Sequence, residues 1–482
     1  MKRFITEDNV LEAAREGKES IFVSENDIIT ALAKETAVRR NISFVSTEAS
    51  AGGKPQSANR TNAESAANNN TQKVRLHTVQ APKAPVLSIG AVKKLPYKGL
   101  LSDKEIAVWR EEFPILKDVI HVGNCSQSAQ SKRVRAAINR YLDNWLDVGM
   151  DWESWVGEVN LAKAEFAKLI NASPDEIAVS ASVSDLVSSV ATALDFSGER
   201  SKVLVSDAEF PTVNYVWLAQ QRRGAKVDFV PVNDNYQIDF NEYLRAIDSN
   251  TLITSYTHSF YLNGFKQDIA KIAELAHSRG SLVMVDSYQC LGTEPVDVKK
   301  MGIDILTSGV LKYLFGIPGI AFMYVNKELT QELSPSVTGW FGQKNPFLFQ
   351  SRYIDWASNA RRFDTGTPPV LTAYAAKAGL EITNEVGVER IKDRTDMLSA
   401  YALEYGSKHG LKIISPFDIS IKAPTTAVWT SHKMPSYEVE AKMRERNIIV
   451  SARGDVVRVA PHFYNTVEEI DTVMTELASV LG

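Results

Sequence analysis

From about Lys94 onward, short apolar runs alternate with amphipathic helical patterns. In chain order the runs are EIAVSA, KVLVSD, VDFVPV, TLITSYTH, LVMVDSY, DILTSG and IAFMYV. Strands that alternate with helices are typical of a parallel sheet, because each parallel strand needs a crossover connection before the next one begins. The sequence therefore predicts an α/β fold with a mainly parallel sheet for this part of the chain.

After Thr367 the pattern changes. We expect one long helix, roughly from Val370 to Val386, and then a smaller unit of mixed type. Its expected strands are LKIIS, TTAVWTS, NIIVSA and VVRVAP, and its expected helices lie in YEVEAKMRER and TVEEIDTVMTELASVL. This favours a large domain over residues 96–369 and a smaller α+β domain over residues 370–482.

The composition changes sharply between Thr47 and Pro85. This stretch is rich in Ala, Asn, Ser, Gly and Gln and has almost no large apolar residues. It cannot bury enough surface to offset the entropy of ordering, so we expect residues 46–95 to form a disordered, flexible linker. The linker separates a small head, residues 1–45, from the body.

The head has helix and strand patterns of its own. Thr6 is expected to cap a helix in EDNVLEAARE, IFV to form a strand, and Asn26 or Asp27 to cap a helix in IITALAKETAVRR. The apolar residues that would share a helical face are Val10, Leu11 and Ala14 in the first helix, and Ile28, Ile29, Leu32 and Ala33 in the second. A unit this small cannot fully bury such faces alone, so we expect it to pack on a partner or on its own body.

Composition excludes several classes of protein. The chain of 482 residues has a net charge of −4, so neither nucleic acid nor a membrane surface is expected as a partner. The two cysteines, Cys125 and Cys290, lie far apart, which argues against a disulfide framework or thiolate zinc site and favours a cytoplasmic location. No apolar signal segment or run of about 20 apolar residues occurs. The seven histidines lack metal-ligand spacing, so no metal is expected.

Polar residues follow several of the predicted strands, at the edge where α/β sheets bind ligands. Ser182, Val183 and Ser184 form a small-residue turn that opens a helix. The free N–H groups of such a turn suit a phosphate, although an ordinary helix cap has the same pattern. Phe210 follows the next strand, either at the mouth of a site or in the core.

Two charged residues lie in apolar surroundings. Asp286 ends an almost wholly apolar strand, where an unpaired carboxylate is costly, so it requires a cationic partner unless it is an ordinary strand-end residue. Lys312 lies in a run of apolar and small residues with no other basic group. Such a lysine either extends to solvent or takes part in chemistry, because desolvation lowers the pKa of its amine.

These residues, in this order, resemble the class V aminotransferase family of pyridoxal-phosphate enzymes of fold type I. That family includes cysteine desulfurases, kynureninases and isopenicillin N epimerase-like proteins. The resemblance runs from about Leu116 to the C-terminus. It is carried by the 182–184 turn, Phe210, VDSYQ, SGVLKYLFGIPGIAF, RFDTGT at 362–367, and Arg458 in VVRVAPHFYNT.

The resemblance implies pyridoxal phosphate as cofactor and a role for each motif. Lys312 would bond covalently to the cofactor and then move the proton at the substrate Cα, while Asp286 would hold the pyridine nitrogen. Arg458 would bind the substrate carboxylate. The implied cofactor contacts are Ser182, Val183, Ser184, Phe210, Asp286, Gln289, Ser308, Lys312, Gly366 and Thr367. The implied substrate contacts are Arg458, Asn124 and Trp340.

The resemblance also implies a homodimer, in which Gly366 and Thr367 reach the cofactor phosphate of the other chain. Trp340 would line the pocket or a gating loop, although a core contact has the same sequence pattern. Cys125 is either a buried bystander or a substrate contact, and His258 is expected to be structural rather than a base.

Departures from the family narrow the expected reaction. The segment NIIVSARGDVVRV has no cysteine, so persulfide chemistry is not available there. We expect an aminotransferase, or a related lyase or epimerase, that acts on a small amino acid. The alternatives are a kynureninase-like hydrolase, suggested by Phe210, a cysteine or selenocysteine lyase without a persulfide cysteine, and a scaffold without catalysis. Retention of Asp286, Lys312 and Arg458 together argues against the scaffold.

The head adds one further hypothesis. Its ITEDNVLEAAREGKESIFVSENDIITALAKETA is similar to short segments of some bacterial microcompartment-associated proteins, such as ethanolamine-utilisation components. This resemblance implies docking on a shell or partner protein, and a location inside a microcompartment. The alternative is a head that folds back on its own body or is a regulatory remnant.

Overall fold

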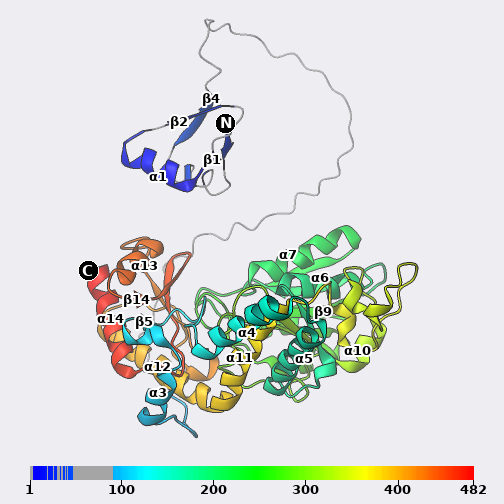
Figure 1. Ribbon diagram of the computed structural model, residues 1–482. Helices are drawn as coiled ribbons and strands as arrows, with labels where there is room; N and C mark the ends of the chain where they lie inside the picture. Colours follow the sequence, from blue (N-terminus) through cyan, green and yellow to red (C-terminus); the bar gives the residue numbers. More distant parts are fainter. Residues whose placement is uncertain are drawn as a thin grey trace, which may run out of the picture. The chain divides into compact units, whose positions relative to one another are not determined.

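The computed structural model describes residues 4–18, 20–24, 27–29, 33, 36–37, 40, 42–46 and 91–482. The chain divides into two compact units, Met1–His77 and Thr78–Gly482 (Figure 1). Most of the predicted linker, residues 47–90, lies outside the described residues. In the described part of the chain, no helix has the length and apolar character needed to cross a membrane.

The described residues of the head form helix α1 (Glu7–Arg15) and two short pairs of parallel strands, and residues 33 and 36–37 are also helical. Helix α1 begins after Thr6, as predicted, and β2 (Ser20–Val23) pairs with β4 (Ser43–Ser46). The helix expected from Ile28 is wrong at its start, because β3 (Ile28–Ile29) pairs with β1 (Phe4–Ile5). β-Branched isoleucines favour this extended pairing. Leu11 and Leu32 are also expected on the apolar helical faces, but their side chains are not among those described.

The head also buries apolar residues against one another. The buried members of its apolar cluster are Val10, Ala13, Ala33, Ala37 and Ile42. They come from the helix and from the segments that surround it, so the head has a small core of its own.

A seven-stranded sheet organises the large domain. The strands are β6 (Ile177–Ser180), β7 (Lys202–Ser206), β8 (Lys226–Val230), β9 (Thr251–Thr257), β10 (Leu282–Asp286), β11 (Ile305–Gly309) and β12 (Ala321–Val325). Their order across the sheet is β6-β12-β11-β10-β9-β7-β8. Every pair is parallel except those that β12 makes with β11 and β6. The prediction of a mainly parallel sheet is confirmed.

Helices cover both faces of this sheet (Figure 1). The surrounding helices are α5 (Trp152–Leu169), α6 (Val183–Ala193), α7 (Pro211–Ala219), α8 (Phe240–Ala246), α9 (Ile269–Ser278) and α10 (Lys327–Glu332). Val283 packs in one apolar cluster with Phe166 of α5, and Met284 packs in another with Leu186 of α6. Adjacent strand residues point to opposite faces, so the sheet is buried on both sides.

Three long helices connect the large domain to the small one. Helix α4 (Lys132–Val148) and α11 (Val370–Val386) pack near α5, and α11 has the bounds predicted for it. Helix α12 (Val388–Lys408) follows directly. Gly387 lies between α11 and α12. Its φ of 88° belongs to a backbone conformation that favours glycine.

The small domain contains the three-stranded antiparallel sheet β13 (Thr426–Trp429), β16 (Val456–Val459) and β15 (Ser451–Arg453), with α13 (Ser436–Arg444) and α14 (Val467–Leu481). The strand expected in LKIIS is wrong: only Ile413 makes an isolated bridge, to Val428. The hydroxyl of Ser415 accepts the N–H of Ala427 at 2.8 Å, in place of a backbone carbonyl.

The segment before the large domain pairs with the small domain. Strand β5 (Ile120–His121) lies parallel to β14 (Ile448–Ile449), and the carboxylate of Glu105 in α3 (Asp103–Arg110) accepts from Arg390 of α12 at 2.7 Å. The chain therefore passes through the small domain before it enters the sheet, which brings residues 121–131 beside the loop that follows β11.

Candidate active site

A cavity of about 400 Å³ lies at the carboxyl ends of the parallel strands. It receives side chains from the turns after β6, β7, β10 and β11, and from β15 and β16 of the small domain. The predicted site residues that line it are Ser182, Val183, Ser184, Phe210, Asp286, Gln289, Lys312 and Arg458. The structure thus brings together residues that lie up to 276 positions apart in the sequence.

The turn after β6 presents the N-terminus of α6 to the cavity. Ser182 is the N-cap of the helix, and its hydroxyl oxygen accepts the N–H of Asp185 at 3.2 Å. The first N–H groups of a helix have no carbonyl partner within the helix, and its dipole favours an anion there. This end of the cavity therefore suits a phosphate.

Lys312 lies in the loop after β11, with its amine between two aromatic rings. Its Nζ is 4.2 Å from the ring centroid of Tyr288 and 5.6 Å from that of Phe210. Burial lowers the pKa of the amine to about 8, although the negative charge of Asp286 opposes this shift. Ser128 donates to the backbone carbonyl of Lys312 and Gln127 donates to that of Gly316, so residues 121–131 support this loop.

Two carboxyl groups, those of Asp286 and Glu209, are buried and interact with each other. Asp286 accepts the N–H of Tyr288 at 2.9 Å, and Glu209 accepts the N–H of Phe210 at 2.7 Å. Desolvation raises the pKa of both, and the charge of Asp286 raises that of Glu209 further. Because Lys312 favours the ionised form of Asp286, we infer that Asp286 carries the negative charge and Glu209 stays protonated.

Arg458 of β16 is only 1% exposed. Its guanidinium donates to the carbonyl of Tyr261 at 2.8 Å and to the hydroxyls of Ser126 and Ser451 at 2.9 and 2.6 Å. These partners are neutral, and Nε is buried with no hydrogen-bond partner among the described residues. A buried guanidinium without a compensating charge favours a bound anion.

Several predicted site residues do not line the cavity. Asn124 is fully buried. Its side-chain amide donates to the carbonyl of Ala460 and accepts from the hydroxyl of Tyr464. Ser308 donates to the carbonyl of Gly309. Both side chains therefore make hydrogen bonds to other residues of the chain, and neither lines the cavity.

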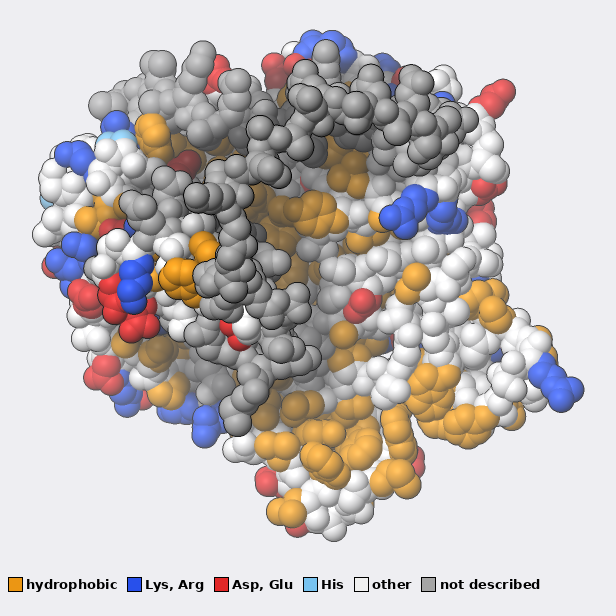
Figure 2. All heavy atoms as spheres, turned by 90° about the horizontal axis from the view of Figure 1, so that it is seen from above, with side chains coloured by type: hydrophobic (Ala, Val, Ile, Leu, Met, Phe, Trp, Pro, Cys, Tyr) orange, Lys and Arg blue, Asp and Glu red, His pale blue; other side chains and the backbone are white. Residues whose placement is uncertain are grey.

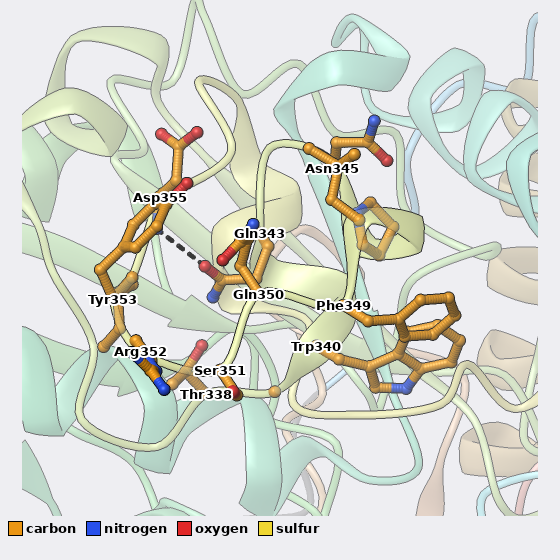
Figure 3. Close-up of a pocket in the computed structure, with 14 residues that line it drawn as sticks. Thr338, Trp340, Gln343, Asn345, Phe349, Gln350, Ser351, Arg352, Tyr353 and Asp355 are labelled. Carbon is orange, nitrogen blue, oxygen red and sulfur yellow. Dashed lines mark hydrogen bonds between the residues drawn. The ribbon is translucent and has the colours of Figure 1, made fainter.

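Trp340, Gly366 and Thr367 also lie outside this cavity. Nε1 of Trp340 donates to the hydroxyl of Thr367 at 3.2 Å. Trp340 lines a separate hollow of about 530 Å³, formed by residues 338–355 (Figure 3). In that hollow its ring stacks on Phe349, with centroids 6.0 Å apart.

Three residues in or near the site could not be found from the sequence. Glu209 immediately precedes Phe210, but nothing in the local sequence shows that it lies near Asp286. Arg453, at the end of β15, and Tyr261, after β9, line the cavity, whereas Glu209 is not among the lining residues.

The remaining reactive side chains are buried. Cys125 lines the cavity, yet it is 1% exposed and packs with Tyr313 and Ala460. Nδ1 of His258 lies 3.0 Å from the hydroxyl of Ser287, and burial lowers the pKa of this histidine to about 4. A neutral, hydrogen-bonded imidazole agrees with a structural role.

The cavity offers groups of the types that pyridoxal phosphate requires. A helix N-terminus suits its phosphate, an ionised carboxylate suits its pyridine nitrogen, and an aromatic face suits its ring. Gln289 is buried in the cavity wall, and its Oε1 has no hydrogen-bond partner among the described residues. This unsatisfied amide is a further sign that the cavity is shaped for a polar ligand.

Comparison with known proteins identifies the family. The profile of the family described as "Aminotransferase class-V" matches residues 131–473, so the chain belongs to the class V aminotransferases. It is 38% identical to the uncharacterized aminotransferase YcbU of Bacillus subtilis (strain 168), over 77% of this chain and 97% of that protein. It is 25% identical to a kynureninase of Geobacillus thermodenitrificans (strain NG80-2), over 77% and 91% of the two chains.

Solved structures share the fold. The apo cysteine desulfurase of Thermococcus onnurineus NA1 superposes with a TM-score of 0.71 and 19% identity, over 80% of this chain and 99% of that one. A C-DES variant with glycine covalently linked to its PLP cofactor gives a TM-score of 0.70 and 18% identity, over 77% and 99% of the chains. Family and fold together make this chain a pyridoxal-phosphate-dependent enzyme.

Proposed function

We propose that the enzyme acts at the Cα of a small amino acid and that its reaction is transamination. The observation that supports this most directly is the position of Lys312. Its buried amine, with a pKa lowered to about 8, shares one cavity with Asp286 and Arg458. An amine of this pKa can be uncharged near neutral pH and can accept a proton there.

When bound, pyridoxal phosphate supplies an electron-withdrawing ring that stabilises negative charge at the substrate Cα. Asp286 would hold a proton on the pyridine nitrogen, and Phe210 would pack on the ring face. Lys312 would hold the cofactor, and its amine, with a pKa lowered to about 8, would move the proton at the substrate Cα. Arg458 fixes the α-carboxylate and so orients the bond that breaks.

The cofactor contacts follow from the same arrangement. The N–H groups of Ser182, Val183 and Ser184 would bind the phosphate, and the amide of Gln289 would donate to the phenolic oxygen. The cavity of about 400 Å³ is near the lower end of the usual range for ligand pockets, about 300–1,000 Å³. This size favours a small substrate.

The kynureninase-like alternative has one specific observation in its favour. Phe210 lines the cavity next to Tyr261, with ring centroids 5.4 Å apart and edge to face. A hydrolase that releases an aryl side chain would use this aromatic wall. The limited volume of the cavity supports the smaller substrate instead.

A panel of amino acids tests the proposed reaction. The purified holoenzyme is mixed with each amino acid, and the absorption spectrum of the cofactor is followed together with release of ammonia and alanine. Transamination converts the cofactor to its pyridoxamine form without such release. Release of alanine from kynurenine supports the hydrolase, and a wild-type protein that remains colourless with saturating cofactor overturns the whole proposal. Lys312→Ala, which lacks the amine, is the control.

We also propose a homodimer in which Gly366 and Thr367 reach the phosphate of the partner subunit's cofactor. Both lie outside the cavity of their own chain, and the surrounding loop exposes Phe349 and Tyr353, which are 73% and 60% exposed. Figure 2 shows hydrophobic side chains gathered in patches on one face of the molecule. Active protein that sediments as a monomer, or a Thr367→Ala variant with unchanged cofactor affinity, would contradict this assembly.

A cytoplasmic location and the docking of the head on a microcompartment shell stay predictions. Fusing residues 1–46 to a reporter tests the second. Enrichment of the reporter with shell proteins supports docking, and its absence, together with protection of the head's amides from exchange in the isolated protein, contradicts it.

A further inference from the structure

Arg453 is a second guanidinium in the wall of the active-site cavity. It ends β15, and a two-residue turn at Gly454 and Asp455 connects it to β16. In the hairpin, Ser451 pairs with Arg458, and Arg453 pairs with Val456. Alternate strand residues share a face, so Arg453, Ser451 and Arg458 lie on the same face of the hairpin.

The positions of the two arginines are diagonal across the strand pair. Such positions lie about 7–8 Å apart, within reach of one ligand for side chains as long as arginine. Both side chains line the same cavity as Lys312. The charges of both lower the pKa of Lys312, which shows that both guanidinium groups lie near the amine.

Arg453 differs from Arg458 in its exposure and in its partners. Arg458 is buried and hydrogen-bonded in place, whereas Arg453 is exposed at the mouth of the cavity. The structure shows no ion pair or hydrogen bond for its guanidinium among the described residues. The adjacent carboxylate, Asp455, instead accepts from the hydroxyl of Ser431 at 2.7 Å.

We propose that Arg453 recognises the side chain of the substrate, and that the substrate is an amino acid with a second carboxylate. This inference rests on the proposed function, because it takes Arg458 as the site of the α-carboxylate. Arg458 then holds the end of the substrate near Lys312. Arg453 forms a charge-assisted bond to the distal carboxylate, which points toward the mouth of the cavity.

The competing role for Arg453 is a contact to the cofactor. The structure favours the substrate, because the phosphate can use the N-terminus of α6 on the strand-end side of the cavity. Arg453 comes from the small domain, as Arg458 does. The two arginines therefore approach the substrate from the same domain, and their spacing selects for a short dicarboxylic amino acid.

The test compares acids with their amides, which have nearly the same shape but no side-chain charge. L-Aspartate, L-glutamate, L-asparagine and L-glutamine are titrated into the holoenzyme, and the spectral change of the cofactor gives the Kd. We expect each acid to bind at least about tenfold more tightly than its amide. In Arg453→Gln this preference should disappear through weaker binding of the acids, with the amides unchanged, and Arg453→Lys should restore part of it.

Arg444→Gln is the matched control, because Arg444 is exposed in the same domain and does not line the cavity. It should keep the full preference for acids. The inference is overturned if the wild type does not prefer acids, if Arg453→Gln keeps the preference, or if that variant weakens acids and amides equally. The absence of any spectral change with every amino acid would instead overturn the proposed function itself.

Discussion

The lowered pKa of Lys312 predicts how fast the apoenzyme takes up its cofactor at different pH values. The uncharged amine is the nucleophile, and burial disfavours the charged form. At pH 7, an amine with a pKa of about 8 is about 10% uncharged, against about 0.03% for an ordinary lysine, a difference of about 300-fold. Below the pKa, the rate of covalent uptake should therefore rise about tenfold per pH unit, and it should level off above about pH 8.

The assay mixes apoenzyme with pyridoxal phosphate and follows the visible absorption band. A free alkyl amine, measured in the same buffers, corrects for ionisation of the cofactor itself. Asp286→Asn removes the carboxylate that raises the pKa of Lys312, so the inflection should move to lower pH in that variant. An inflection above about pH 10, or one that moves upward in Asp286→Asn, would refute the reasoning.

Three further predictions concern the framework of the site. In Gly309→Ala the new Cβ would lie 2.1 Å from the ring of Tyr288, so we expect a lower Tm and weaker cofactor binding in a titration. Lys163→Met leaves the buried carboxylate of Asp364 without its ion-pair partner at 3.0 Å, and denaturant unfolding should show a loss of about 3–5 kcal/mol. Glu209→Gln replaces a protonated carboxyl by a neutral group of similar shape, so cofactor affinity should stay within about threefold of the wild type.

Matched variants decide the first two of these predictions. Gly198→Ala adds a Cβ where no atom lies within 4 Å, and Arg245→Met breaks an exposed ion pair, so both should change stability by less than about 0.5 kcal/mol. If Gly309→Ala behaves like its control, the argument from the close approach of Tyr288 is contradicted. If Lys163→Met behaves like its control, the argument from the buried ion pair is contradicted. A large loss of affinity in Glu209→Gln would mean that Glu209, rather than Asp286, carries the charge.

The sequence predicts the sheet well because its strands are buried on both faces. Such strands appear as continuous apolar runs, and the polar residues that end them, such as Asp286, stand out. The 182–184 turn and Lys312 stand out in the same way, because each follows a buried strand. The short strand at Ile28 was missed, because two residues carry too little periodicity to distinguish a strand from a helix.

Side-chain pairings across distant segments are harder to predict. Asn124 has the residue type of a substrate contact, but its hydrogen bonds to Ala460 and Tyr464 are visible only in three dimensions. The same limit applies to Glu209 and Arg453. Each becomes notable only after folding, the first beside Asp286 and the second beside Arg458.

The balance of charge in the cavity connects these observations. Lys312, Arg453 and Arg458 are the basic residues of the lining, and Asp286 is its carboxylate among the residues described there. In the proposed site, Asp286 would use that negative charge to hold a protonated pyridine nitrogen. The phosphate can be held by the uncharged N–H groups of α6. No carboxylate partner is shown for the guanidinium groups of Arg453 and Arg458 among the described residues, and in our proposal a dicarboxylic substrate would supply one negative charge for each arginine.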